Sequence, residues 1–122
     1  MKKLLVLLFV FPNLGVAEAI TFQCIFSSYC SLEDGCSNTG FDLRFEYDTI
    51  AEIAFLKGNN GIAEVAPIKG SYGITFLELL ETGAVQSTTI ALDQTAVHSR
   101  NSIIAGRLLA SQYYGLCQIE EN

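Results

Sequence analysis

Phe41-Asp42-Leu43-Arg44-Phe45-Glu46-Tyr47-Asp48 is the stretch of sequence that decides the fold. Apolar and charged side chains alternate along it without exception, which is the period-2 pattern of a β-strand with one buried face and one face in water. The pattern predicts a strand over 41–48. Its expected buried face consists of Phe41, Leu43, Phe45 and Tyr47.

Other β-like segments lie on both sides of this strand. Residues 20–26 alternate less cleanly and place Phe22, Cys24 and Phe26 on one side. Further strands are expected over 52–56, 62–65, 74–80, 85–92, 96–99 and 112–119, and a hairpin is expected at Lys57–Gly61. Glycine recurs at turn positions roughly every 10 to 12 residues, a spacing typical of an all-β sandwich or barrel.

Residues 102–111 leave two alternatives open, because their apolar pattern fits either a strand or one or two helical turns. The chain is long enough for one hydrophobic core. The predicted fold class is therefore all-β, a single domain over 20–122 in which a small antiparallel meander closes as a disulfide-braced barrel. A β-sandwich is the alternative.

The first nineteen residues have the order of a secretion signal. Lys2 and Lys3 precede an apolar run from Leu4 to Phe11, and small residues follow up to Ala19. The run is shorter than the roughly 17 to 25 residues that a membrane span needs. We expect a signal peptide over 1–19 with cleavage after Ala19. The product would be soluble and periplasmic or secreted. It would not be a lipoprotein, because the first cysteine, Cys24, does not directly follow the cleavage point and is preceded by Thr21-Phe22-Gln23 rather than by small residues.

Four cysteines in a small exported domain indicate disulfides. Cys30 and Cys36 enclose a short polar loop with a glycine, so a local bridge between them is geometrically easy and leaves Cys24 to pair with Cys117. Three pairings are possible in all. Zinc is not expected, since the cysteines are separated by 5, 5 and 80 residues rather than in close pairs.

The net charge of residues 20–122 limits the classes of partner that we expect. Residues 20–122 hold 7 − 2 = 5 Lys and Arg against 13 − 1 = 12 Asp and Glu, a net charge of −7. Nucleic acids and anionic membranes bind through cationic side chains, so we expect neither as a partner. A basic protein is the partner that this charge would attract.

Few residues suggest a site. The single histidine, His98, and the absence of a G-x-S-x-G nucleophile motif leave no catalytic set, so no catalytic residue and no metal or other cofactor is expected. An exposed tyrosine can anchor a protein partner. The candidate partner surface consists of Tyr114, His98, Arg100, Glu33 and Asp34.

Two short motifs carry a resemblance to a known family. Phe22-Gln23-Cys24 and Tyr113-Tyr114-Gly115-Leu116-Cys117 resemble the ends of the periplasmic inhibitors of C-type lysozyme. The resemblance implies a small β-barrel with its ends tied by a disulfide. The family's S-G-x-x-Y and T-K-G motifs are absent, so no inhibitory residue carries over. The Cys30-to-Cys36 loop and His98-Ser99-Arg100 look closer to uncharacterised small exported proteins of Gram-negative bacteria, which supply no activity.

The expected function is therefore non-enzymatic binding by a small exported protein. Its most concrete form is inhibition of a cationic cell-wall enzyme such as lysozyme. The alternative is a small-ligand-binding β-barrel, which requires an apolar cavity inside the fold. An enzyme that uses His98 ranks third.

Overall fold

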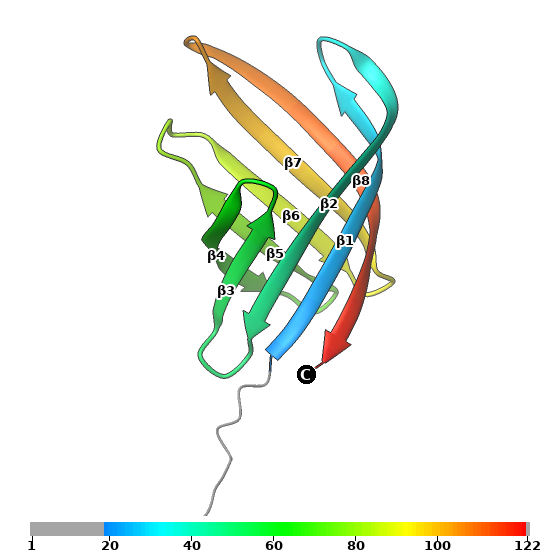
Figure 1. Ribbon diagram of the computed structural model, residues 1–122, viewed down its shortest axis with the longest axis vertical. Coiled ribbons are helices and arrows are strands. Elements are labelled where there is room, and N and C mark those ends of the chain that lie inside the picture. Colours follow the sequence, from blue (N-terminus) through cyan, green and yellow to red (C-terminus); the bar gives the residue numbers. More distant parts are fainter. Residues whose placement is uncertain (1–18, 122) are drawn as a thin grey trace, which may run out of the picture.

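The computed structural model describes residues 19–121, which form eight antiparallel strands and no helix (Figure 1). The strands are β1 (Ala19–Ser31), β2 (Gly35–Asp48), β3 (Ile53–Gly58), β4 (Gly61–Lys69), β5 (Gly73–Leu79), β6 (Val85–Ala91), β7 (Thr95–Ile104) and β8 (Arg107–Glu121).

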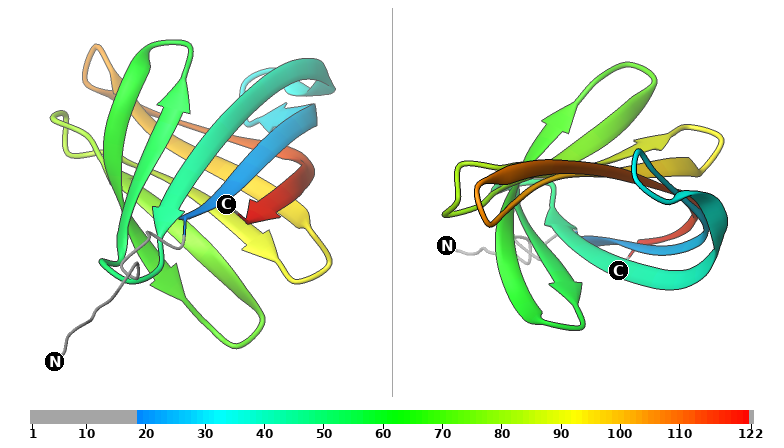
Figure 2. Two further views of the ribbon diagram at one scale, coloured as in Figure 1. Left: turned by 60° about the horizontal axis from the view of Figure 1, so that its bottom comes forward. Right: turned by 90° about the horizontal axis from the view of Figure 1, so that it is seen from above.

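Each strand pairs with the next one along the chain, and β8 pairs with β1 to close the ring. The ring is a closed barrel, so the predicted meander is confirmed and the alternative of a β-sandwich is wrong. Figure 2 shows the strands tilted around the barrel axis, as closure requires. A short turn joins each of the seven pairs of consecutive strands.

The alternating stretch 41–48 lies where its pattern predicts. Leu43, Phe45 and Tyr47 are buried inside the barrel, and Phe41 is half-buried against the same core. The intervening charged side chains lie on the outer wall, where the carboxylate of Glu46 is 3.2 Å from the Arg44 Nε atom. The period of two therefore correctly predicted which side chains of β2 face the core and which face the solvent.

The middle of the barrel is filled by aromatic rings. Phe45 and Phe76 stack with their centroids 4.5 Å apart, and Phe22 meets Phe76 edge-on at 5.4 Å. Phe26 is fully buried above them. These rings divide the barrel interior into two ends, one beside the chain termini and one beneath the β1–β2 and β7–β8 hairpins.

Residues 102–111 adopt the strand alternative, because β7 and β8 continue as a long hairpin up to a two-residue turn. Ala105 and Gly106 at this turn have φ angles of 52° and 77°. Positive φ at both central residues matches the twist of antiparallel strands, so a tight reversal is possible there.

Both long hairpins extend beyond the shorter strands β3 to β6 at one end of the molecule (Figure 1). β1 and β2 reach Ser31 and Gly35, well past the alternating segments that predicted them. The distal halves of β1 and β2 pair with each other beyond the apolar core. Their side chains therefore need not be apolar, and many are Ser, Thr and Asn. We call this the hairpin end and the opposite one the terminal end.

The expected signal peptide over 1–19 lies outside the described residues, except for Ala19, which pairs with Asp48 at the start of β1. Within residues 19–121, no helix is long and apolar enough to span a membrane.

Candidate functional site

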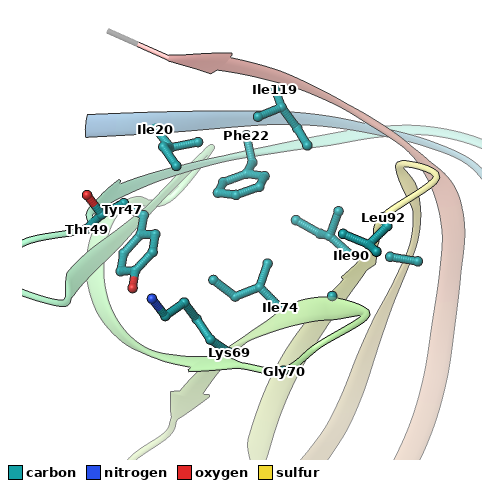
Figure 3. A pocket seen from close by; sticks show the side chains of 12 residues that line it. Ile20, Phe22, Tyr47, Thr49, Lys69, Gly70, Ile74, Ile90, Leu92 and Ile119 are labelled. Carbon is teal, nitrogen blue, oxygen red and sulfur yellow. The ribbon is translucent and has the colours of Figure 1, made fainter. Parts of the chain in front are cut away.

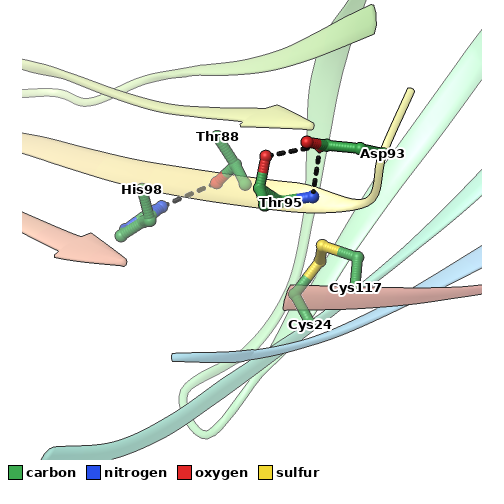
Figure 4. Close-up of a disulfide and its surroundings, with 6 residues drawn as sticks. All are labelled: Cys24, Thr88, Asp93, Thr95, His98 and Cys117. Carbon is green, nitrogen blue, oxygen red and sulfur yellow. Dashed lines mark hydrogen bonds between the residues drawn. A yellow bond between two sulfur atoms is a disulfide. The ribbon is translucent and has the colours of Figure 1, made fainter. Parts of the chain in front are cut away.

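The cysteines form the two predicted bridges, Cys24–Cys117 and Cys30–Cys36. Cys24 and Cys117 are directly opposite each other in the register of β1 and β8, and their side chains are buried. This bridge therefore fastens the seam that closes the barrel (Figure 4). Cys30 and Cys36 are opposite each other near the tip of the β1–β2 hairpin. Two disulfides are typical of an oxidising compartment.

His98 lies in the barrel interior and not on a partner surface, because the inward face of β7 carries it. Its side chain is 1 % exposed, and the rings of Phe26, Phe41 and Tyr113 surround it. Burial lowers the pKa of His98 to about 4, and the positive charge of Arg100 acts in the same direction. The imidazole is therefore neutral near pH 7.

The neutral imidazole links two neighbours. Arg100 Nε lies 3.3 Å from His98 Nε2 and can only donate, so Nε2 is the accepting nitrogen. The ring proton then resides on Nδ1, which donates to Thr88 Oγ1 at 2.7 Å (Figure 4). A chain of hydrogen bonds thus runs from the buried threonine through His98 to Arg100.

Two aromatic rings hold the guanidinium of Arg100. Its Cζ atom lies 4.9 Å from the centroid of Phe41 on β2 and 5.2 Å from the centroid of Tyr113 on β8. A cation over an aromatic face is attracted by the ring's negative π-surface. Together with the His98 bond, these contacts fix the guanidinium in position and orientation.

The terminal nitrogens of Arg100 remain available. Arg44 and Arg107 each lie within 3.3 Å of a carboxylate on the protein surface. Within residues 19–121, Arg100 forms no ion pair, and its side chain makes one hydrogen bond, through Nε. A guanidinium has five N–H donors, so four of them are unused.

Two cavities adjoin at Arg100 at the hairpin end. One has a volume of about 470 Å³, and the other about 390 Å³. Phe41, Leu56, Glu78 and Gln86 are among the residues that line the first, and Tyr29 and Tyr113 are among those that line the second. We call the two cavities together the Arg100 cup. Ligand sites of small molecules have volumes in this range.

The structure brings three of the five predicted surface residues to the cup. Arg100, Glu33 and Asp34 line the second cavity together, and His98 lies directly beneath Arg100. Glu33 also pairs with Arg107 across the hairpin tips at 3.3 Å. Tyr114 lies apart from the cup, on the outer wall, where it is 38 % exposed.

Sequence reasoning missed the residues that make Arg100 a site. Phe41 is predicted on the buried face of its strand and Tyr113 belongs to the C-terminal motif, and neither carries a sequence signal of contact with an arginine. Glu78 was read only as part of a strand. The alternation of β7 did contain one usable signal, because Ala96, His98 and Arg100 are spaced by two and so share one face.

Within residues 19–121, no three His, Cys, Asp or Glu side chains lie close enough together to hold a metal ion. Comparison with protein-family models, curated proteins and solved structures gives no match to this chain.

Proposed function

We propose that this protein is an exported, non-enzymatic binding barrel whose Arg100 cup takes the oxyanion group of a small organic molecule. Of the functions expected from the sequence, this is the small-ligand barrel. Export is supported by the N-terminal pattern of charge and apolar residues and by the two disulfides.

One observation carries the proposal: a positioned guanidinium faces a cavity with its terminal nitrogens unused. Because His98 occupies Nε, the edge formed by the two terminal nitrogens is the one open to a ligand. This edge matches the two oxygens of a carboxylate, and such paired charge-assisted bonds are stronger than neutral ones. The flanking rings fix the guanidinium before any ligand arrives, which lowers the entropy lost on binding.

The charges on the cup walls set the ligand's own charge. Glu78 lines the first cavity, while Glu33 and Asp34 line the second. Their carboxylates repel a second negative charge, so the cup favours a monocarboxylate over a multiply charged anion. The apolar side chains of Phe41, Leu43 and Leu56 favour a compact apolar body on that monocarboxylate.

Benzoate tests the proposal, because it combines one carboxylate with a flat apolar body. It is titrated into the purified oxidised protein while the ¹H–¹⁵N signal of Arg100 Nε is followed. We expect benzoate to shift this signal in a saturable and salt-sensitive way, and citrate to bind less well. Replacing Arg100→Gln should weaken benzoate at least about tenfold, because it removes a charge-assisted pair.

The matched control is Arg44→Gln, since Arg44 lies on the outer wall and is paired with Glu46. This variant should bind benzoate as the unaltered protein does. An Arg100 signal that stays in place at millimolar benzoate would refute the proposal. Equal benzoate affinity of the Arg100→Gln variant would refute it too.

Inhibition of a basic cell-wall enzyme, the most concrete function expected from the sequence, is here the second candidate, and exposed side chains on the outer wall favour it. Ile25 and Leu116 are opposite each other on β1 and β8, and both are 61 % exposed. Tyr114 lies two residues along β8 and so on the same face. An exposed apolar patch on an acidic protein suits a basic partner.

A lysozyme assay tests this second candidate. Stoichiometric purified protein should slow a C-type lysozyme, less so at high salt, and Tyr114→Ala should reduce the effect. Tyr72→Ala is the control, because Tyr72 is exposed at the terminal end. Full lysozyme activity at a severalfold excess of the protein would remove this candidate.

A further inference from the structure

A further cavity of about 300 Å³ opens at the terminal end of the barrel, on the far side of the aromatic core from the Arg100 cup. Its walls are apolar side chains from β1, β5, β6, the β6–β7 turn and β8 (Figure 3). They are Ile20, Phe22, Ile74, Ile90, Leu92 and Ile119.

One buried polar atom faces this apolar space. The side chain of Tyr47 is 2 % exposed, and its hydroxyl has no hydrogen-bond partner within residues 19–121. Figure 3 shows the Tyr47 ring directed into the cavity with the hydroxyl at its tip. Buried hydroxyl groups in folded proteins nearly always have a hydrogen-bond partner, so an unpaired one at the wall of a cavity calls for a partner inside that cavity.

A cation lines the same cavity as this hydroxyl. Lys69, at the end of β4, also lines the cavity, and Figure 3 shows its ammonium group and the Tyr47 hydroxyl directed toward the same point. Within residues 19–121, three cations are paired with carboxylates on the surface, namely Arg44, Lys57 and Arg107. Lys69 and Arg100 form no such pair there, although carboxylates outnumber cations in the chain. Each of these two cations lines a cavity, Lys69 at the terminal end and Arg100 at the hairpin end.

We propose that this terminal cavity binds a small aliphatic monocarboxylate. The ammonium of Lys69 and the hydroxyl of Tyr47 both donate hydrogen bonds, so they call for an acceptor, and the ammonium favours one with negative charge. The aliphatic and aromatic walls take the hydrocarbon body. The volume lies at the lower limit of ligand cavities, so the hydrocarbon is short.

This second site is independent of the proposed function. Phe45 and Phe76 stack between the two ends, so a ligand at one end touches none of the groups at the other. A failure of benzoate to bind at Arg100 would not count against the terminal cavity. A failure of ligand binding in the terminal cavity would likewise not count against the Arg100 cup.

Octanoate and 1-octanol are the probes, because they share a hydrocarbon chain and differ in the carboxylate. Each is titrated into the purified oxidised protein while backbone ¹H–¹⁵N signals are followed. Octanoate should shift the amides of Tyr47, Ile74 and Ile90 and bind about tenfold more tightly than octanol, the size of effect that one charge-assisted bond gives.

Three variants separate binding from packing. Tyr47→Phe should weaken octanoate about tenfold, whereas Tyr72→Phe, at an exposed tyrosine of the same end, should leave octanoate binding unchanged. Lys69→Met should weaken octanoate and leave octanol unchanged, because only the carboxylate pairs with the ammonium.

Three results would overturn the inference. The first is the absence of amide shifts around Tyr47 at saturating octanoate. The second is equal octanoate affinity in the Tyr47→Phe and Tyr72→Phe variants. The third is loss of octanoate binding in the Arg100→Gln variant, which would assign octanoate to the Arg100 cup instead.

Discussion

His98 Nδ1 and Thr88 Oγ1 lie 2.7 Å apart inside the barrel, in a place where the charged form of the imidazole is disfavoured. The pKa of His98 in the folded protein, about 4, is lower than the 6.5 of an unburied histidine. Unfolding therefore takes up a proton between these two pH values. The stabilising contribution of the neutral imidazole is complete above pH 6.5 and is lost as the pH falls toward 4.

The expected loss of unfolding free energy over this interval is about 3 kcal/mol, measured by urea denaturation at a series of pH values. His98→Gln is the control, because an amide can also donate and accept but does not titrate. Its stability should change little between pH 6.5 and 5, where most carboxylates are still ionised. A flat profile of the unaltered protein in that window would contradict the prediction.

The two disulfides should differ in their contribution to stability. Cys24–Cys117 joins residues 93 apart, and its replacement by two alanines should lower the unfolding free energy by about 4 to 5 kcal/mol. Cys30–Cys36 joins residues 6 apart, so the same replacement there should remove about 2 kcal/mol. Urea titration of both variants measures the difference, and equal losses would contradict it.

Gly115 should tolerate no side chain. A Cβ atom there would overlap the carbonyl oxygen of Ile25 and lie 2.7 Å from the Cα atom of Phe26. Because both are backbone atoms of β1, Gly115→Ala should lower the unfolding free energy by about 3 kcal/mol. Gly40→Ala is the control, since nothing lies within 4 Å of its Cβ position. Its thermal midpoint should stay close to that of the unaltered protein.

The unpaired hydroxyl of Tyr47 should make the ligand-free protein less stable than it would be without it. Tyr47→Phe removes the hydroxyl and keeps the ring, so we expect the unfolding free energy to rise by about 1 kcal/mol. Tyr72→Phe should leave it within about 0.5 kcal/mol. A fall in stability of the Tyr47→Phe variant would show that the hydroxyl is satisfied in the folded protein.

Glu78 should oppose anion binding in the Arg100 cup. Glu78→Gln keeps the shape of the side chain and removes its charge, so benzoate should bind about two- to fivefold more tightly. Glu81→Gln is the control, because Glu81 lies in the adjoining β5–β6 turn. Calorimetric titration of benzoate into both variants distinguishes them, and weaker binding after Glu78→Gln would mean that Glu78 positions the ligand.

The sequence predicted the closed barrel because its strongest signals were local. The unbroken alternation from Phe41 to Asp48 and the short loop between Cys30 and Cys36 each depend on neighbouring residues alone. The pairing of Cys24 with Cys117 then followed, and it joined the ends of the meander. The choice between strand and helix for residues 102–111 could not be made from the sequence. The turn that joins the two strands has Ala105, a non-glycine residue, at positive φ, and no sequence pattern predicts this.

The sites could not be predicted to the same extent. Arg100 becomes a site only through Phe41 and Tyr113, which lie about sixty residues before it and on the next strand after it. Tyr47 was correctly assigned to the buried face, yet whether its hydroxyl finds a partner depends on distant strands. His98 was expected on the candidate partner surface, but it lies on the inward face of β7, where it is buried and bonded to Thr88.

The seam between β1 and β8 also imposes an order on oxidative folding. A ribosome completes Cys24 long before Cys117, while Cys30 and Cys36 follow within a few residues. Before Cys117 is present, any disulfide that Cys24 forms with Cys30 or Cys36 is non-native. The native bridge to Cys117 therefore requires that Cys24 stays reduced until the last strand is present, as it does when Cys30 and Cys36 pair first, or that an isomerase exchanges an early non-native disulfide. The yield of native barrel consequently depends on the thiol chemistry of the compartment in which the chain folds.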